Sequence, residues 1–213
     1  MALPSDDGFY GQVLSFAAAK NSLDEGKTRE EFHRLNAQAE ATRHFINALG
    51  TLSDYGQDPP GEVEVMEALD HALACVIKAT WAYDGALLIS DDSSGDLIFA
   101  LVQGEMPKTN LLWRRVPAGR GVAHWAASHK RATIVNNTVN DERFYKGIDA
   151  AINFCTRSIL AVPLLNGDET IGVLEIINKK DGQFFSLSDQ NHLTIMARLA
   201  TTLLTQLREN QSV

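Results

Sequence analysis

Lys179 and Asp189 have residue types and a spacing that suit an ion pair across a loop. They lie in the stretch NKKDGQFFSLSDQ, residues 178–190, between two hydrophobic segments. Lys179 would end a strand and Asp189 would start the last helix, where the helix dipole favours a negative charge. Burial of Phe185 would anchor the loop between them, worth about 1.5–3 kcal/mol. We interpret this stretch as a structural clasp rather than as a ligand contact.

A second group that could do chemistry lies on one face of an expected helix. Glu67, His71, Cys75 and Lys78 are spaced by one turn, so a histidine and a thiol could share a metal ion or activate a thiolate. Two soft ligands rarely make a structural metal site, and we favour a face that packs against the N-terminal helix or a second subunit. No metal is expected.

The remaining cysteine and histidines suggest no catalytic centre. Cys155 is interpreted as a lone, partly buried thiol. His124 and His129 flank Trp125, and we favour hydrogen-bonded histidines over haem or iron ligands. Neither a nucleophile–base pair nor a metal triad is recognised, so we expect a protein that is not an enzyme.

Composition narrows the possible partners. The net charge of −8 argues against a general nucleic-acid binder. Only two cysteines are present, without a CxxC pair, which argues against a disulfide framework. We expect no signal peptide and no membrane-spanning segment, and hence a cytoplasmic protein with no membrane partner.

Three helices are expected from apolar periodicity. The first covers residues 28–53, with Thr28 and Glu31 as a capping box, and residues 8–25 are a weaker helical candidate. The break DYGQDPPG, residues 54–61, marks the expected boundary between an N-terminal helical extension, 1–60, and a domain, 61–210. Further helices are expected over 62–80 and 187–208, the last with apolar residues in heptad-like spacing.

Short β-like segments lie between these helices. They are GALLIS, DLIFALV, ATIVN, SILAVPLL and TIGVLEIIN, and the last two are joined by an Asn-Gly turn signal. The order of helix, two strands, helix, loop, two strands and helix predicts an α+β domain with an antiparallel sheet, because the βαβ alternation of a Rossmann fold is absent.

The chain resembles the GAF domain family from about residue 62 to 208. The resemblance rests on VPAGRGVAHWAASHKRATIVNN, DERFYKG, RSILAVPLL and TIGVLEIINK. It implies a PAS-like fold with a central antiparallel sheet of five to six strands. The stretch 178–190 is similar to the Asn-Lys/Arg, Phe, Asp-Glu signature of cyclic-nucleotide-binding members, with Gln190 replacing the final Glu.

The same resemblance implies a ligand site and its residues. Backbone N–H groups of two residues on a short helix, residues of a covering segment, and two positions on the sheet would contact a cyclic nucleotide, cAMP or cGMP. The implied residues are Gln103, Val122, Ala123, Tyr145, Asp149, Ile152, Thr156 and Glu175. Gln103 would sit at the base edge, where its amide could serve adenine or guanine.

The resulting hypothesis is a non-catalytic sensor of a small molecule. It would signal to a downstream protein through flanking helices that pair in a homodimer, because their apolar stripes are wider than one contact needs. One alternative is a dimerisation or scaffold module whose pocket is vestigial, filled by Ile148 and Ile152. A further alternative is a GAF-type free methionine sulfoxide reductase, disfavoured by the placement of Cys75 and Cys155.

Overall fold

A computed structural model describes residues 7–54 and 61–210, with side chains from residue 29 onward. The chain divides between Ala39 and Glu40 into two compact units. The first unit contains the N-terminal part of helix α1 (Asp7–Asp54), and the second contains the rest of that helix and all later elements.

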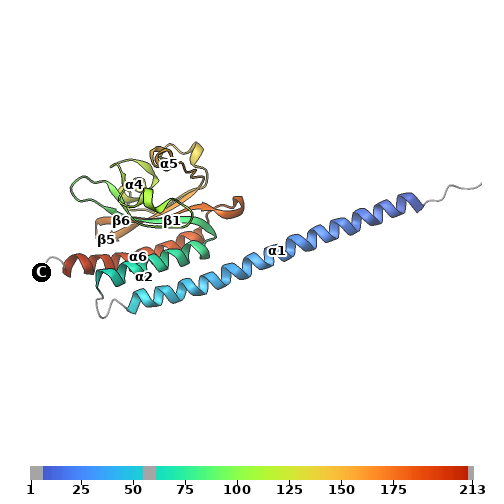
Figure 1. Cartoon of the computed structure of the whole chain (residues 1–213), viewed down its shortest axis with the longest axis horizontal. Coiled ribbons are helices and arrows are strands. Elements are labelled where there is room, and N and C mark those ends of the chain that lie inside the picture. Colours follow the sequence, from blue (N-terminus) through green and yellow to red (C-terminus); the bar gives the residue numbers. More distant parts are fainter. Residues whose placement is uncertain (1–6, 55–60, 211–213) are drawn as a thin grey trace, which may run out of the picture. The chain divides into compact units, whose positions relative to one another are not determined.

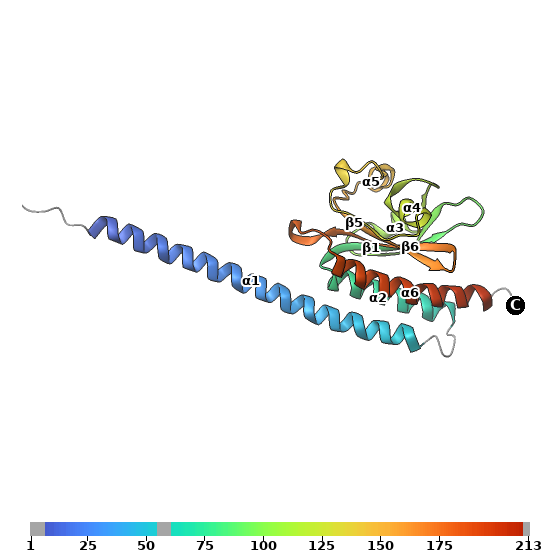
Figure 2. The ribbon, with the colours of Figure 1, turned by 180° about the vertical axis from the view of Figure 1, so that it is seen from behind.

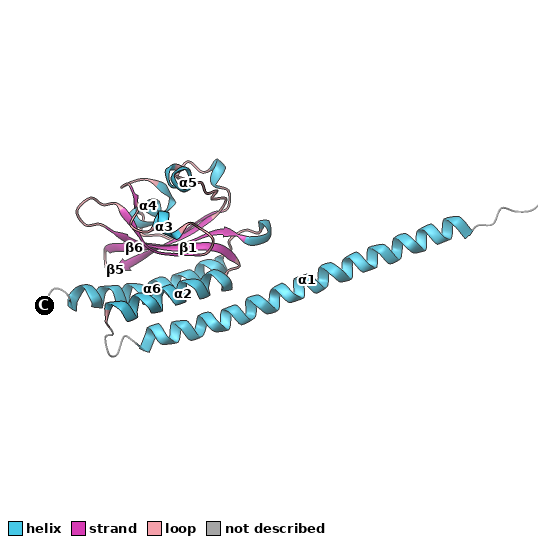
Figure 3. Cartoon of the chain, in the orientation of Figure 1, coloured by secondary structure: helices cyan, strands magenta, loops and turns pink. Residues whose placement is uncertain are grey.

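A six-stranded antiparallel sheet forms the centre of the second unit (Figure 3). The strand order is β3-β2-β1-β6-β5-β4, so the first and last thirds of the domain meet where β1 pairs with β6. The strands are β1 (Ala82–Ser90), β2 (Leu97–Gln103), β3 (Arg115–Val116), β4 (Thr133–Val135), β5 (Ile159–Asn166) and β6 (Glu169–Lys179). The expected α+β fold with five to six strands is confirmed.

Helices cover both faces of the sheet (Figures 1 and 2). The long helices α2 (Glu62–Ala79) and α6 (Leu187–Asn210) lie along one face. The short helices α3 (Lys108–Leu111), α4 (Gly121–Ser128) and α5 (Gly147–Ile152) lie on the other. Two short 3-10 helices, Thr138–Asn140 and Lys180–Gly182, complete the elements. Each face has its own apolar core, and β6 contributes to both by alternation.

The last turns of α1 belong to the core on the α2/α6 face. Phe45, Ala48 and Leu52 are buried there, and the Phe45 ring meets His192 edge-on at 5.9 Å between centroids. The core therefore includes residues that precede position 61, where the sequence places the domain boundary.

Helix α1 differs from the sequence expectation at its start. It passes through Thr28 without interruption, so the capping box predicted at Thr28 and Glu31 is wrong. The segments 8–25 and 28–53 form one helix, because the single Gly26 between them costs only about 1 kcal/mol and does not terminate it. The helix ends at Asp54, and residues 55–60 of the predicted break lie outside the described part of the chain.

Helix α6 uses its apolar stripe within its own domain. Leu193, Met196, Ala200 and Leu203 are buried against α2, the sheet and the end of α1. Leu199, Leu204 and Leu207, which widen the stripe, are partly buried and pack against the same core. The homodimer expected from the flanking helices stays a prediction. Among the helices in the described ranges, none combines the length and apolar composition that crossing a lipid bilayer requires.

Candidate functional site

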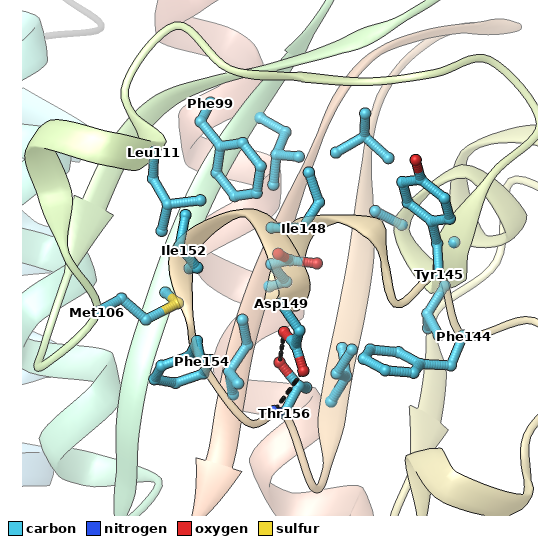
Figure 4. A pocket seen from close by; sticks show the side chains of 18 residues that line it. Phe99, Met106, Leu111, Phe144, Tyr145, Ile148, Asp149, Ile152, Phe154 and Thr156 are labelled. Atoms are coloured by element: carbon cyan, nitrogen blue, oxygen red, sulfur yellow. Dashed lines mark hydrogen bonds between the residues drawn. The ribbon is translucent and has the colours of Figure 1, made fainter.

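A cavity lies between the sheet and the segment that carries α5 (Figure 4). Its cavity volume is about 60 Å³, and the space between atoms is about 540 Å³ when the open solvent at its mouth is included. Its wall is mostly apolar and comes from β1, β2, β5, β6, α3, α4, α5 and their loops. The lining residues are Leu88, Phe99, Met106, Leu111, Val116, Gly121, Val122, Ala123, Phe144, Tyr145, Ile148, Asp149, Ile152, Phe154, Thr156, Ile159, Glu175 and Ile177.

Strand alternation places Glu175 on the floor of this cavity. Val173 and Ile177 point to the core on the cavity side, whereas Leu174 and Ile176 point to the helix side. Glu175 lies two residues from each of Val173 and Ile177 along the strand, so its side chain points to the same, cavity side of the sheet. Its partners in register are Ala86 on β1 and Ala161 on β5, whose small side chains leave the carboxyl unobstructed on both sides.

Glu175 is a buried residue whose carboxyl has no polar partner among the described residues, although its oxygens are not fully enclosed. The residue is 6% exposed, and among the described residues no hydrogen bond or ion pair reaches this side chain. Burial, followed by the negative charge of Asp149, raises the pKa of Glu175 to about 7. Near neutral pH the group is therefore poised between a neutral acid and a carboxylate.

This carboxyl should make folding stability depend on pH. The folded protein keeps the Glu175 proton up to about pH 7, whereas the ordinary pKa is about 4.5. The stabilisation is present below pH 4.5 and is lost as the pH rises through 7, by up to about 3 kcal/mol. Urea unfolding at about pH 5 and pH 8 should show this loss in the wild type and not in Glu175→Gln.

A matched control lies at the other end of the same strand. Glu169 is exposed and pairs with Arg208, so Glu169→Gln should keep the wild-type pH dependence. The assignment to Glu175 is contradicted if Glu175→Gln and the wild type lose stability in parallel over this range.

Asp149 and Thr156 bind one another at the covering segment (Figure 4). The Thr156 backbone N–H and hydroxyl each donate to the Asp149 carboxylate at 2.7 Å. Asn153, in the left-handed conformation at φ 52°, ends α5 between them. The pair fixes α5 to the chain that enters β5, and so fixes the cavity's cover.

The start of α4 forms another part of the wall. Gly121 has φ +85°, a conformation that suits glycine, and Arg120 at the N-cap makes no side-chain cap. Val122 and Ala123 follow in the first turn, whose backbone N–H groups have no partner within the helix. Such N–H groups can donate hydrogen bonds to an anionic oxygen.

Seven of the eight implied ligand-site residues line the cavity, and Gln103 does not. The Gln103 amide donates to Asp70 on α2 at 2.5 Å and accepts from Lys108 at 3.1 Å. Gln103 therefore does not line this cavity, and its implied role at a base edge stays a prediction. The physical reason for its orientation is a bulge in β2, where the register with β1 passes from Phe99 to Leu101 and skips Ala100. The extra residue reverses the alternation, so that Val102 takes the cavity-side core and Gln103 faces α2.

The sequence reasoning missed most of the apolar wall. Phe99, Met106, Leu111, Phe144 and Phe154 all line the cavity. Alternation along β2 could have indicated Phe99, because it shares the parity of Leu97. The others lie on loops and short helices, where no periodicity indicates a direction.

The clasp predicted from residues 178–190 forms as an ion pair in the protein interior. The Lys179 ammonium lies 2.8 Å from each carboxylate oxygen of Asp189 and donates to the Thr80 carbonyl at 2.6 Å. The side chains of Lys179 and Asp189 are 9% and 5% exposed. Asp189 also accepts from the Ser186 N–H at 2.8 Å and hydroxyl at 2.9 Å at the start of α6, in the manner of a capping box.

Phe185 and Asn178 complete the clasp. Phe185 is buried, and its backbone exchanges hydrogen bonds of 2.8 and 3.2 Å with the Asn136 amide. Asn178, at φ +59°, accepts from the Arg157 N–H at 2.7 Å and donates to the Cys155 carbonyl at 3.0 Å. Gln190 donates its backbone N–H to Ser186 within the first turn of α6. The clasp thus contacts both neighbours of the cavity residue Thr156.

The cysteines lie away from the cavity. Cys75 is buried on α2, on the opposite face of the sheet, with its sulfur 3.6 Å from His71 Nε2. Burial raises the pKa of the Cys75 thiol. Cys155 is exposed and does not line the cavity. In the described ranges, no group of three or more His, Cys, Asp or Glu side chains is arranged to hold a metal ion.

These features define a class: an α+β domain with a buried cavity between an antiparallel sheet and a short covering helix. The model of the GAF domain family matches residues 64–204, and the chain belongs to this family.

Curated relatives include phosphodiesterases of 3',5'-cyclic nucleotides. Over 77 residues the chain is 34% identical to the rod cGMP-specific 3',5'-cyclic phosphodiesterase subunit alpha of Bos taurus, covering 36% of this chain and 9% of that protein. Over 90 residues it is 33% identical to the dual 3',5'-cyclic-AMP and -GMP phosphodiesterase 11A of Takifugu rubripes, covering 41% and 10%. The chain thus spans only about a tenth of the length of these relatives.

Solved structures share the fold at low identity. The GAF domain of a phosphoenolpyruvate-protein phosphotransferase from Coxiella burnetii superposes with a TM-score of 0.67 and 14% identity, over 80% of this chain and 98% of that one. A free methionine-R-sulfoxide reductase from Neisseria meningitidis superposes with a TM-score of 0.63 and 21% identity, over 83% and 93%. At these identities the likeness concerns the fold alone.

Proposed function

We propose that this GAF domain is a non-catalytic sensor that binds a cyclic nucleotide in the cavity beneath α5. The observation that carries the proposal is the Glu175 carboxyl, which stands buried and unpartnered among the described residues of an otherwise apolar cavity. A buried polar group without a partner is costly, and a ligand with hydrogen-bond donors would satisfy it.

The other end of the ligand would meet the start of α4. No Lys, Arg or His side chain is among the residues that line the cavity, so an anionic phosphate would depend on backbone N–H groups there. Those of Val122 and Ala123 are suited to this role. Two of the relatives are phosphodiesterases, one named as cGMP-specific and one named for both cyclic AMP and cyclic GMP. Part of each aligns with this chain, which supports a cyclic nucleotide as the ligand.

The structural effect of ligand binding would be transmitted to α6 through the clasp. Asp149 binds Thr156, whose neighbours Cys155 and Arg157 bind Asn178. The next residue, Lys179, binds Asp189 at the start of α6. These contacts form a continuous polar chain from the cavity cover to a flanking helix. A ligand that shifts α5 would act on this chain, which is a short physical route for coupling.

The ligand proposal predicts that Thr156→Val weakens cyclic-nucleotide binding by about tenfold, or about 1.4 kcal/mol. The substitution keeps the side-chain shape but removes the hydroxyl bond to Asp149, and so loosens the cover. Isothermal titration of cAMP and cGMP measures the change. The matched control is Thr170→Val, which removes a hydroxyl bond to Ala127 outside the cavity lining and should leave affinity unchanged. Absence of binding to the wild type at millimolar nucleotide would refute the proposed ligand.

We also propose a homodimer, formed through α1 rather than through α6. Phe32 and Leu35 are 61% and 54% exposed and lie one turn apart on the helix. An exposed apolar pair on a helix surface suits pairing with a second copy.

Light scattering of the full chain should therefore give a dimeric mass at tens of micromolar. Replacing Phe32 and Leu35 with glutamate should shift the chain to the monomer, because four charges would meet at the interface. Val63→Glu, at an exposed apolar position on α2, serves as the control and should stay dimeric. A monomeric mass for the unaltered chain would end the dimer proposal.

The rival functions rest on specific observations. Ile148 and Ile152 project into the cavity (Figure 4), as a scaffold with a filled pocket requires, and the titration above separates this case from a sensor.

A free methionine sulfoxide reductase shares the fold. Neither Cys75 nor Cys155 lines the cavity, which does not favour sulfoxide chemistry there.

A further inference from the structure

We propose that the Tyr145 ring is a gate between the ligand cavity and a neighbouring groove, and that an anionic ligand enters the cavity from that groove. The inference rests on the proposed ligand cavity, but not on the identity of the ligand. It adds the route of entry, the side chain that moves, and a cation, Arg120, that the entering ligand would meet first.

The cavity has to enlarge before it can hold a nucleotide. Its volume is about 60 Å³, whereas sites for drug-sized ligands measure about 300–1,000 Å³. A second hollow lies beside it, with a volume of about 270 Å³, lined by residues of α4 and of the loop before α5. Only together do the two spaces reach the volume that such a ligand requires.

Three residues line both spaces and so form the wall between them: Gly121, Phe144 and Tyr145. Because Gly121 has no side chain, the two aromatic rings close this wall. Figure 4 shows the Phe144 ring directed into the cavity and the Tyr145 ring at its edge, with the hydroxyl turned away from Thr156. No hydrogen bond within the described ranges holds that hydroxyl. The Tyr145 ring is therefore kept in place by packing.

The Tyr145 ring lies over Gly147, the first residue of α5. A methyl group at Gly147 would lie 2.2 Å from the ring carbon Cζ and 2.3 Å from the hydroxyl oxygen. The ring can therefore occupy this position only because residue 147 has no side chain. The backbone of Gly147 is not left-handed, so alanine there suits the helix and would displace the ring without straining the backbone.

The chain is anchored on both sides of the gate. Arg143 donates to the Asp141 carboxylate at 2.9 and 2.6 Å and to the Thr133 hydroxyl at 3.1 Å. On the other side, two hydrogen bonds of 2.7 Å hold the Asp149 carboxylate. Between these anchors a side chain moves more readily than the backbone, so the Tyr145 ring rather than the whole of α5 opens the wall.

The groove carries a cation that an anionic ligand can use. Arg120 lines the groove immediately before Gly121, and no hydrogen bond or ion pair to a described residue engages its guanidinium. Arg143, the other arginine of the groove, is neutralised by Asp141, and Glu142 is the opposing charge. Because the whole chain has a net charge of −8, an anion approaches against repulsion, which a local unpaired cation reduces. Arg120 is therefore the charge contact on the way to the gate.

The test measures chemical access to the cavity and needs no nucleotide. Val122 lines the cavity but not the groove, and it is 2% exposed. Val122→Cys in the full chain with Cys155→Ser therefore places a thiol behind the gate. Its rate of reaction with a methanethiosulfonate reagent follows the fraction of molecules in which the gate is open. Mass spectrometry gives this rate, and the Cys155→Ser chain alone gives the background from buried Cys75.

Gly147→Ala should raise the labelling rate of this thiol by at least about tenfold, because the added methyl displaces the ring from its closed position. Tyr145→Ala, which removes the ring, should raise the rate at least as much. Ala150→Gly is the matched control. It weakens α5 at an exposed position without touching the ring, and it should leave the rate close to that of the parent.

The charge of the reagent tests the route at low salt. One reagent carries a sulfonate and the other a trimethylammonium group, and each rate is divided by that with a small free thiol. Arg120→Gln should lower the ratio of anionic to cationic labelling by about threefold or more. Arg131→Gln removes the same charge from an exposed position outside the groove lining, and it should leave the ratio nearly unchanged.

Three results would overturn the gate: fast labelling of the parent chain, equal rates in Gly147→Ala and the parent, or an equal acceleration by Ala150→Gly. Equal effects of Arg120→Gln and Arg131→Gln would overturn the groove as the route. If urea unfolding shows that Val122→Cys does not fold, Ile159→Cys replaces it as the reporter, since Ile159 also lines the cavity and is 5% exposed.

These results are separable from the proposed function. A gated cavity in a chain that binds no cyclic nucleotide would refute the proposed ligand and keep the gate. Nucleotide binding in a chain whose labelling does not respond to Gly147→Ala or Tyr145→Ala would refute the gate and keep the ligand.

Discussion

Replacing Asp189 with alanine should lower the unfolding free energy by about 3–5 kcal/mol. The loss would be large because the Lys179 ammonium would stay buried without a counter-charge, with the Thr80 carbonyl and the face of the Phe185 ring as its described partners. The first turn of α6 would also lose the acceptor for the Ser186 N–H and hydroxyl. Urea unfolding of wild type and variant measures the change.

A matched control is available at an exposed Lys–Asp pair. Asp168 pairs with Lys130 at 3.4 Å on the surface, and Asp168→Ala should leave stability unchanged within error, since water screens such pairs. A double variant, Lys179→Met with Asp189→Leu, should recover part of the loss because no charge is left buried. Equal effects of Asp189→Ala and Asp168→Ala would contradict the clasp as a structural element.

Replacing Phe45 with alanine should cost about 3–5 kcal/mol of unfolding free energy. Phe45 is 1% exposed and packs with α2 and α6, with its ring against His192. The cavity left by the ring would be lined by residues of two helices, which cannot close on it without moving the sheet.

The next residue supplies the control. Ile46 lies on the same helix and is 59% exposed, so Ile46→Ala should change stability by less than about 0.5 kcal/mol. A chain shortened to begin at Gly61 should be destabilised in the same way as Phe45→Ala, since it lacks Phe45, Ala48 and Leu52. If the shortened chain unfolds at the same urea concentration as the full chain, the end of α1 is not part of the core.

The two variants also bear on signalling. Asp189 lies in the first turn of α6, and Phe45 packs against His192 in its second turn. Both therefore fix the helix that would carry a signal. A variant that weakens the response to ligand without lowering stability is expected between these two residues and the cavity. Asn178 lies there, because it binds the Arg157 N–H and the Cys155 carbonyl on either side of the cavity residue Thr156.

Local sequence patterns determined the elements and one interaction. Helices α2 and α6, the long strands and the antiparallel class follow from periods of 3.6 and 2 residues and from turn residues, which act within a few positions of the chain. The pairing of Lys179 with Asp189 was predictable because a strand end and a helix start are joined by one short loop that holds Phe185.

The tertiary structure alone decided the direction of side chains at element ends and on loops. Gln103 faces α2 because Val102 takes the cavity side, and no local pattern near the Gly104 turn indicates which of the two does so. The burial of Phe45 and Leu52 depends on α6, which lies far along the chain. The unpartnered state of Glu175 depends on Ala86, Ala161 and Asp149 arriving from three other elements. Burial and electrostatics sum over all neighbours in space, and sequence spacing reports only the neighbours along the chain.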